Sequence, residues 1–118
     1  MQLEALKNLV VETLEEMKGI DVAVIDVRGK TSVTDYMIVA TGTSAIHVKS
    51  LAESVSIAVK EAGETPLGME GAQEGEWTLL DLNGVVLHVM QAKVRDFYQL
   101  ERLWAVDTPN EEWRSGDA

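Results

Sequence analysis

Hydrophobic positions recur at steps of three and four through residues 2–18, which is the spacing of one face of an α-helix. These positions are Leu3, Leu6, Val10, Leu14 and Met17. Glutamates and other polar side chains occupy most of the positions between them. The pattern predicts an amphipathic helix that stops at Gly19, because glycine tolerates the backbone conformation that ends a helix.

Two short hydrophobic segments follow, and both have the composition of β-strands. Residues 22–27 contain one charged residue, Asp26, whose side chain should face solvent or a partner. Residues 36–40 form an unbroken apolar run, which is typical of a strand buried on both faces. The polar link between the two segments is short, so we expect the strands to pair in antiparallel fashion.

A glycine turn then leads into the longest periodic segment. Gly42 allows a sharp turn after the central strand, and the Ser44 hydroxyl can cap the following helix by accepting a hydrogen bond from a backbone N–H. The helix runs to residue 62, with one apolar stripe made of Val48, Leu51, Ala52, Val55, Ala58, Val59 and Ala62. A long helix between two strands predicts a βαβ crossover.

The second half of the chain predicts a loop, a hairpin and a short helix. Residues 63–76 hold four glycines and a proline, which favours a loop with a short strand at residues 67–69. Residues 77–82 and 85–90 flank Asn83 and Gly84, a pair typical of a type I′ turn, in which both central residues have positive φ. Residues 94–104 have the pattern of a last helix.

The element order is therefore α-β-β-α-β-β-α. It predicts an α+β fold, with a mixed β-sheet of four to five strands and helices packed mainly on one face. Two long helices are too few to cover both faces of such a sheet, which leaves one face open for a partner. Residues 1–104 form the expected domain, and the composition of residues 105–118 predicts a frayed C-terminal tail.

Composition narrows the functional classes. The 118 residues suffice for one domain with a core, and no apolar run approaches the ~20 residues of a membrane helix. The absence of cysteine excludes disulfides, thiolate metal sites and cysteine nucleophiles. The N-terminus is acidic and lacks the pattern of a signal peptide. We therefore expect a cytoplasmic location and no membrane contact.

The formal net charge of −10 is the most informative global property. It opposes direct binding to nucleic acid, since affinity for phosphates comes from lysine and arginine. It suits a basic protein partner, because complementary charge speeds encounter and suppresses wrong partners. Solubility alone also explains an acidic surface, so charge by itself does not choose between these two interpretations.

Two histidines are candidates for chemistry, and their separation in the sequence does not suggest a metal site. His47 falls on the polar side of the long helix, where we expect it to be solvated. His88 lies on the same side of its strand as Val86 and Met90. It is either a hydrogen-bonded core residue or part of an open sheet face.

Three carboxylates, Asp26, Asp35 and Asp81, lie in or beside strands and could in principle hold a divalent cation for phosphoryl transfer. With the glycine turn, they resemble a nucleotidyltransferase arrangement. That arrangement requires a second acid two positions after the first, and Asn83 stands there. The glycine-rich loop also lacks the lysine of a phosphate-binding loop. We expect no enzymatic activity, no cofactor and no metal, and keep residual nucleotide binding as the alternative.

Recognition of a partner is the remaining class of function. Trp77 opens the hairpin beside the loop, and Arg95, Tyr98 and Arg102 share one side of the last helix. Tryptophan, tyrosine and arginine are the types enriched at interface hot spots. Packing inside the domain would explain Trp77 and Tyr98 equally well.

Four segments resemble the RsfS family of ribosomal silencing factors, also called the Iojap family. Residues 34–44 read TDYMIVATGTS, and residues 66–71 read PLGMEG. Residues 77–82 read WTLLDL with VLHVM at 86–90, and residues 95–104 read RDFYQLERLW. The segments occur in order, and the similarity runs from about Leu3 to Trp104.

The resemblance implies a nucleotidyltransferase-like fold without catalysis. It also implies a translation repressor that binds the large ribosomal subunit through its fourteenth protein and blocks joining of the small subunit when nutrients are short. A homodimer is a further implication. By matching positions, the expected contact residues are Trp77, Asp81, Leu82 and His88 on the hairpin, with Arg95, Tyr98 and Leu103 from the last helix.

Overall fold

The computed structural model describes residues 1–30, 34–71 and 75–98, which contain three helices and five strands. In chain order these are α1 Leu3–Glu16, β1 Ile20–Asp26, β2 Tyr36–Gly42, α2 Ala45–Glu61, β3 Gly68–Glu70, β4 Trp77–Asp81, β5 Val85–Gln91 and α3 Ala92–Tyr98. The predicted α+β fold with a mixed sheet is confirmed. The short strand predicted in the loop is β3, which begins one residue later than expected.

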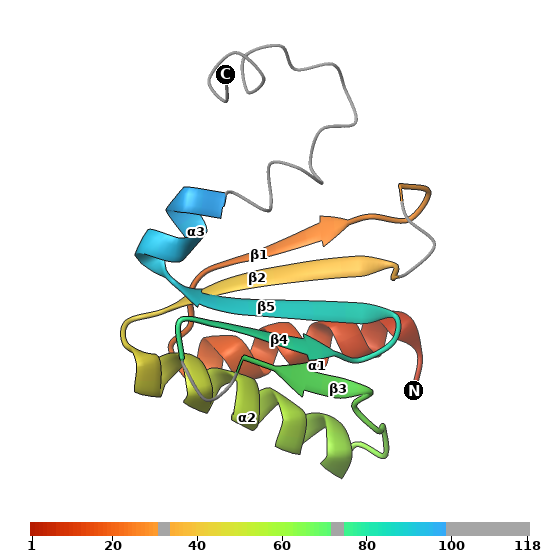
Figure 1. Ribbon diagram of the computed structural model, residues 1–118. Helices are drawn as coiled ribbons and strands as arrows, with labels where there is room; N and C mark the ends of the chain where they lie inside the picture. The colour runs from red at the N-terminus through yellow and green to blue at the C-terminus, as the bar shows by residue number, and fades with distance from the viewer. Residues whose placement is uncertain (31–33, 72–74, 99–118) are drawn as a thin grey trace.

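The strands lie in the order β1-β2-β5-β4-β3, with β5 in the middle and β2 beside it (Figure 1). The pairs β1–β2, β4–β5 and β3–β4 are antiparallel, whereas β2 and β5 are parallel. The chain leaves β2, passes through α2, β3 and β4, and returns to β5 beside β2. The predicted antiparallel first pair and the predicted crossover are both confirmed.

Helices α1 and α2 cover one face of the sheet, and the short α3 lies at one end of the opposite face (Figure 1). The helix-side core combines buried residues of α1, α2, β2, β4 and β5, among them Leu14, Ile38, Leu51, Leu80 and Leu87. A second cluster on the other face joins Ile25, Val27, Met37, Val39 and Met90. All seven residues of β2 are buried, which confirms the two-faced strand predicted from its unbroken apolar run.

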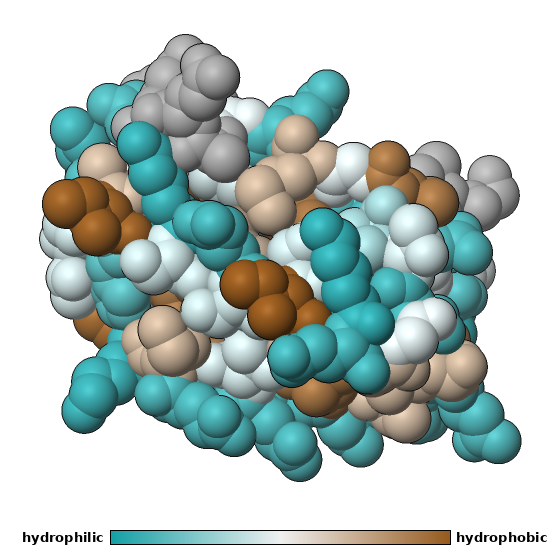
Figure 2. All heavy atoms as spheres, turned by 90° about the horizontal axis from the view of Figure 1, so that it is seen from below, coloured by the Kyte–Doolittle hydropathy of each residue, from teal (hydrophilic) through white to brown (hydrophobic). Residues whose placement is uncertain are grey.

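The outer side of the two helices is mostly hydrophilic. Figure 2 shows hydrophobic side chains scattered there among polar ones. The most exposed of them on α2 are Ile46 and Ile57, at 76% and 54% of their surface. Isolated apolar side chains of this kind are normal on protein surfaces. None of the described helices is long and apolar enough to cross a membrane.

The turn between β2 and α2 has the predicted cap. The Ser44 hydroxyl accepts a hydrogen bond from the backbone N–H of His47 at 3.1 Å. Gly42 is required by close packing, because a Cβ there would lie 2.7 Å from Val48 Cγ2 and 2.9 Å from the Val48 nitrogen. The end of β2 and the first turn of α2 therefore lie so close together that only glycine fits at this position.

His47 lies half-exposed on the polar side of α2, but both of its ring nitrogens bond to the protein rather than to solvent alone. Its Nδ1 accepts a hydrogen bond from the Thr43 N–H at 2.9 Å, and its Nε2 lies 2.9 Å from the Met17 carbonyl oxygen. Because a carbonyl can only accept, Nε2 carries the proton. The ring thus ties the end of α1 to the start of α2, and partners distant in the sequence decide its environment.

The hairpin at residues 83–84 is confirmed, but the type I′ turn is wrong. Of the two central residues only Asn83 has positive φ, at 75°. The Gly84 carbonyl accepts hydrogen bonds from the N–H groups of Asp35 and Tyr36, each at 3.1 Å. A Cβ on Gly84 would lie 2.5 Å from Leu3 Cδ1. Contacts with α1 and with the start of β2 therefore determine the backbone here.

The last predicted helix begins two residues earlier than expected, at Ala92. The described part of this helix ends at Tyr98. Leu103 and the tail predicted for residues 105–118 lie outside the described residues.

Gly42→Ala should lower the free energy of unfolding by about 1–3 kcal/mol, because the new methyl group collides with the backbone of Val48. Urea denaturation measures the loss. Gly68→Ala is the matched control, since a Cβ at Gly68 meets nothing within 4 Å and that residue is also in a strand. Equal losses in the two variants would show that close approach to α2 is not what Gly42 provides.

Candidate functional site

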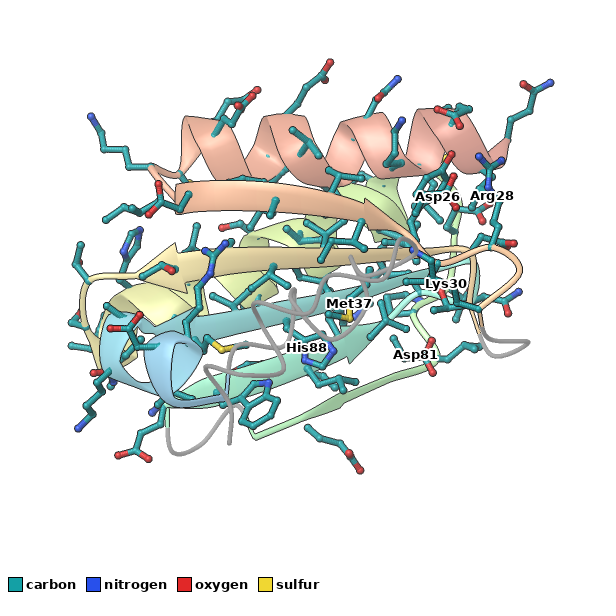
Figure 3. All side chains as sticks on the ribbon, turned by 90° about the horizontal axis from the view of Figure 1, so that it is seen from above. Asp26, Arg28, Lys30, Met37, Asp81 and His88 are labelled. Atoms are coloured by element: carbon teal, nitrogen blue, oxygen red, sulfur yellow. The ribbon has the colours of Figure 1, made fainter. Side chains whose placement is uncertain are left out.

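Five half-buried side chains lie on the sheet face that α1 and α2 leave uncovered. They alternate with buried residues along two strands, and we call them the hairpin face: Trp77, Leu79 and Asp81 of β4, with Val86 and His88 of β5. Figure 3 looks onto this side of the sheet, with His88 and Asp81 labelled. The strand period of two thus separates the helix-side core positions of the hairpin from half-buried positions on the other face, where Trp77 packs against the second buried cluster.

Register brings these side chains together across the hairpin. Leu79 lies opposite His88, and Asp81 lies opposite Val86. Trp77 is diagonal to His88, and its indole Nε1–H donates a hydrogen bond to His88 Nδ1 at 3.0 Å. The two ring centroids are 5.8 Å apart and the planes are tilted by 51°. The hairpin face therefore has one aromatic pair, fixed by a polar contact, among aliphatic neighbours.

Burial lowers the pKa of His88 from its ordinary value of 6.5 to about 4. The cause is desolvation, which penalises the charged imidazolium more than the neutral ring. The hydrogen bond with Trp77 agrees with this, because an indole N–H can only donate and needs an unprotonated Nδ1. At neutral pH the His88 ring is therefore uncharged.

The charges on this side of the hairpin are acidic. Asp81 ends β4, and its Oδ1 accepts a hydrogen bond from the Asn83 N–H at 2.9 Å. Glu70 of β3 lies opposite Leu79 and is exposed, so it extends the same side of the sheet. The hairpin face and the β3 positions paired with it contain no lysine or arginine. A partner that approaches here meets aromatic and aliphatic groups bordered by carboxylates.

Sequence reasoning placed Trp77, Asp81 and His88 together, and the structure brings them to one face. Leu82 does not join them, because it is 5% exposed and packs in the helix-side core. Its side chain follows the opposite strand phase from Asp81, so in this fold it is a core residue. Leu79 and Val86 were not predicted as site residues, although the alternation within residues 77–90 indicates them.

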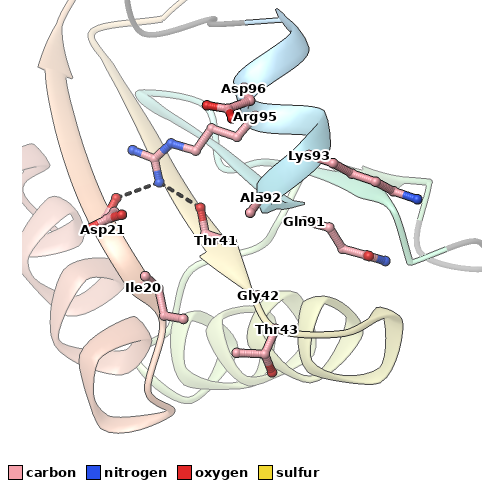
Figure 4. A pocket seen from close by; sticks show the side chains of 10 residues that line it. All are labelled: Ile20, Asp21, Thr41, Gly42, Thr43, Gln91, Ala92, Lys93, Arg95 and Asp96. Carbon is pink, nitrogen blue, oxygen red and sulfur yellow. Dashed lines mark hydrogen bonds between the residues drawn. The ribbon is translucent and has the colours of Figure 1, made fainter.

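Arg95 lies elsewhere in the fold. Its Nη1 donates to the Asp21 carbonyl at 2.6 Å and to Thr41 Oγ1 at 2.9 Å, which ties α3 to β1 and β2 (Figure 4). Tyr98 is the last residue of α3, and its side chain is outside the described part of the structure, as is all of Leu103. Arg95 is thus the one residue predicted from the last helix whose side chain is described. It holds α3 against β1 and β2 and lines a pocket.

That pocket has a volume of about 890 Å³ and lies where β2 and β5 end. Its lining carries charges of both signs, from Asp21, Lys93, Arg95 and Asp96 (Figure 4). The carboxyl ends of parallel strands are a common ligand position in α/β sheets. None of the three strand acids, Asp26, Asp35 or Asp81, lines it.

The strand carboxylates do not gather into a catalytic centre. Asp26 lies opposite Tyr36 on the helix side of the sheet, whereas Asp81 lies opposite Val86 on the other side. Asp26 instead pairs with Arg28 at 2.6 Å, and this guanidinium lowers the pKa of the Asp26 carboxyl to about 2 (Figure 3). Within residues 1–30, 34–71 and 75–98, no group of three or more histidines or acids could hold a metal ion.

Comparison with known proteins decides the family. The family model described as "Ribosomal silencing factor during starvation" (RsfS) matches residues 1–117. The chain belongs to the RsfS family. The ribosomal silencing factor RsfS of Chromobacterium violaceum is 44% identical over 110 residues, which cover 93% of this chain and 90% of that protein.

Solved structures and distant relatives agree with the assignment to the RsfS family. A crystal structure of a Chromobacterium violaceum protein superposes with a TM-score of 0.88 at 44% identity and covers 93% of this chain and 92% of that one. A mouse protein named "Mitochondrial assembly of ribosomal large subunit protein 1" is 26% identical over 102 residues, covering 84% of this chain and 45% of its own length. The RsfS match extends beyond residue 104, and a domain boundary there stays a prediction.

The lowered pKa of His88 makes the free energy of unfolding depend on pH. The unfolded chain binds a proton near pH 6.5 and the folded chain only near pH 4, so stability present above pH 6.5 is lost as the pH falls to about 4. The loss should approach roughly 3 kcal/mol. Urea denaturation at pH 7 and pH 4.5 measures it.

The control for that measurement is His88→Gln, which cannot titrate. The remaining titratable groups contribute alike to both proteins, so the difference between the two pH dependences isolates His88. A variant that loses as much stability as the original chain would show that His88 is not held neutral by burial.

Proposed function

We propose that this chain represses translation by binding the large ribosomal subunit and sterically blocking the small subunit from joining it when nutrients are short. The chain's membership of the RsfS family supports a ribosome-silencing role. The name of the mouse relative connects that protein with the large subunit, and we extend this connection to the present chain. A cytoplasmic location follows from the proposal.

In this proposal the hairpin face is the surface that contacts the ribosome. The grouping of its half-buried side chains is the structural observation on which the proposal depends. A partner can desolvate the half-buried surface of the uncharged side chains of the hairpin face, which are Trp77, Leu79, Val86 and His88. Tryptophan is among the residue types most enriched at interface hot spots. Asp81 and Glu70 border the hairpin face with negative charge. The partner that fits is a basic protein, and we infer that it is the fourteenth protein of the large subunit. Tyr98 and Leu103 stay predicted members of this surface.

We also infer that the chain acts by binding and not as an enzyme. The separation of Asp26 and Asp81 on opposite faces of the sheet supports this, because phosphoryl transfer needs carboxylates that share a metal ion. A steric block requires only a stable complex at the surface where the subunits meet. Formation of a homodimer, which the resemblance implies, is a separate prediction.

Trp77→Ala should weaken binding to the large subunit about tenfold or more, because it removes the largest side chain of the hairpin face. Sedimentation of the purified protein with separated subunits in a sucrose gradient measures binding, and addition of the small subunit measures joining. The original chain should migrate with the large subunit and reduce the amount of joined ribosomes. Binding to neither subunit would contradict the proposed function.

Charge reversal tests which surface is used. Glu70→Lys and Glu53→Lys make the same change in net charge, one beside the hairpin face and the other on the exposed side of α2. Glu70→Lys should weaken binding by a few-fold, with a larger loss at low salt, whereas Glu53→Lys should bind like the original chain. Equal losses in both variants would mean that only the overall charge matters.

A further inference from the structure

We propose that His88 is a specificity residue of the hairpin face, which presents its Nε2–H as a hydrogen-bond donor to a backbone carbonyl of the partner. Trp77 is the positioning residue that fixes this orientation of the proton. The inference rests on the proposed function for the identity of the partner. The state of the His88 ring in the free protein can be tested without it.

The first step concerns the side of the ring that faces Trp77. The indole Nε1 lies 3.0 Å from His88 Nδ1, and an indole nitrogen cannot accept a hydrogen bond, because its lone pair belongs to the aromatic system. Nδ1 must therefore be the acceptor. A neutral imidazole carries one proton, so the proton is on Nε2. An imidazolium would place a second N–H against the indole N–H, and burial already disfavours that charged form.

The second step concerns the opposite side of the ring. Within the described residues, the hydrogen bonds of His88 are limited to the one from Trp77. Among those residues, the buried side-chain polar atoms that lack a hydrogen bond comprise Thr78 Oγ1 alone. Among the described residues, the Nε2 atom of the half-buried His88 thus has no acceptor, and it is not one of their buried, unbonded polar atoms.

The third step concerns the surroundings of this donor. Leu79 of β4 and Val39 of β2 lie opposite His88 on its two neighbouring strands, and both are apolar. A partner that covers this site and brings no acceptor would leave the N–H without water and without a bond, which is costly. A partner that brings an oxygen atom to this position gains a bond in an apolar setting.

The acceptor is a neutral one. The charged side chains that border this surface on β4 and β3 are Asp81 and Glu70, and both would repel a partner carboxylate. A backbone carbonyl accepts a hydrogen bond without this repulsion. A basic partner that places an unpaired main-chain carbonyl over His88 therefore complements the negative charge of Asp81 and Glu70 and accepts the hydrogen bond from the Nε2–H.

Nitrogen-15 NMR of the free protein tests the ring. At pH 7, the long-range proton–nitrogen spectrum of His88 should show a protonated Nε2 and an unprotonated Nδ1. His88→Leu identifies the signals by their loss, which separates them from those of His47. Trp77→Phe keeps an aromatic ring but removes the donor, and it should shift the His88 tautomers towards a mixture. A proton on Nδ1 in the original chain would overturn the proposal.

Large ribosomal subunits test the donor. His88→Leu, which fills similar space without an N–H, should bind them about tenfold more weakly, as expected for a lost bond in an apolar interface. His88→Gln keeps an N–H at a similar reach and should recover part of that loss. His88→Leu that binds as tightly as the original chain would overturn the donor role and leave the proposed function intact. Failure of the original chain to bind would overturn the proposed function and the partner with it.

Circular dichroism and urea denaturation of each variant separate binding from folding. Trp77→Phe retains the bulk of the ring, so its effect on binding should follow the change in tautomer and not a loss of stability. A folded Trp77→Phe variant with the original tautomer and the original affinity would show that Trp77 does not position His88.

Discussion

Burial of β2 on both faces is the constraint on which the other elements depend. A strand whose seven residues are all buried needs a layer on each side and a hydrogen-bonded neighbour on each edge. Helices α1 and α2 supply one layer, and β1 and β5 supply the two edges. The hairpin of β4 and β5 is thereby placed so that one side faces the helices and the other becomes the hairpin face.

Local patterns predicted most of this arrangement. The unbroken run at residues 36–40, the cap at Ser44 and the turn dipeptide at Asn83 each act through neighbours in the sequence, and each predicted its element correctly. The details that failed depend on distant contacts. The Gly84 carbonyl accepts hydrogen bonds from the N–H groups of Asp35 and Tyr36, and the His47 ring bonds to the carbonyl of Met17. These partners lie far away in the sequence, so the local pattern around Gly84 or His47 does not predict them.

The candidate site divides in the same way. Strand alternation is enough to place Trp77, Asp81 and His88 on one side, and the same alternation, continued from Leu80, turns Leu82 to the core. The bond between Trp77 and His88 is a diagonal contact across the hairpin, and it depends on register as well as on phase. Sequence similarity suggested which residues matter, while the register shows that two of them are bonded to each other.

The parallel pairing of β2 with β5 also sets the order in which the domain can be completed during synthesis. The second edge of β2 stays without its neighbour until residues 85–91 have left the ribosome, although the strand itself is made some fifty residues earlier. Until then the nascent chain carries an apolar strand with an open edge, the kind of structure that pairs with other chains. The hairpin that we infer to bind the partner is thus also the segment that closes the sheet, so a chain interrupted before β5 would lack Val86 and His88 of the contact surface and would expose an edge of β2, a strand buried throughout in the complete fold.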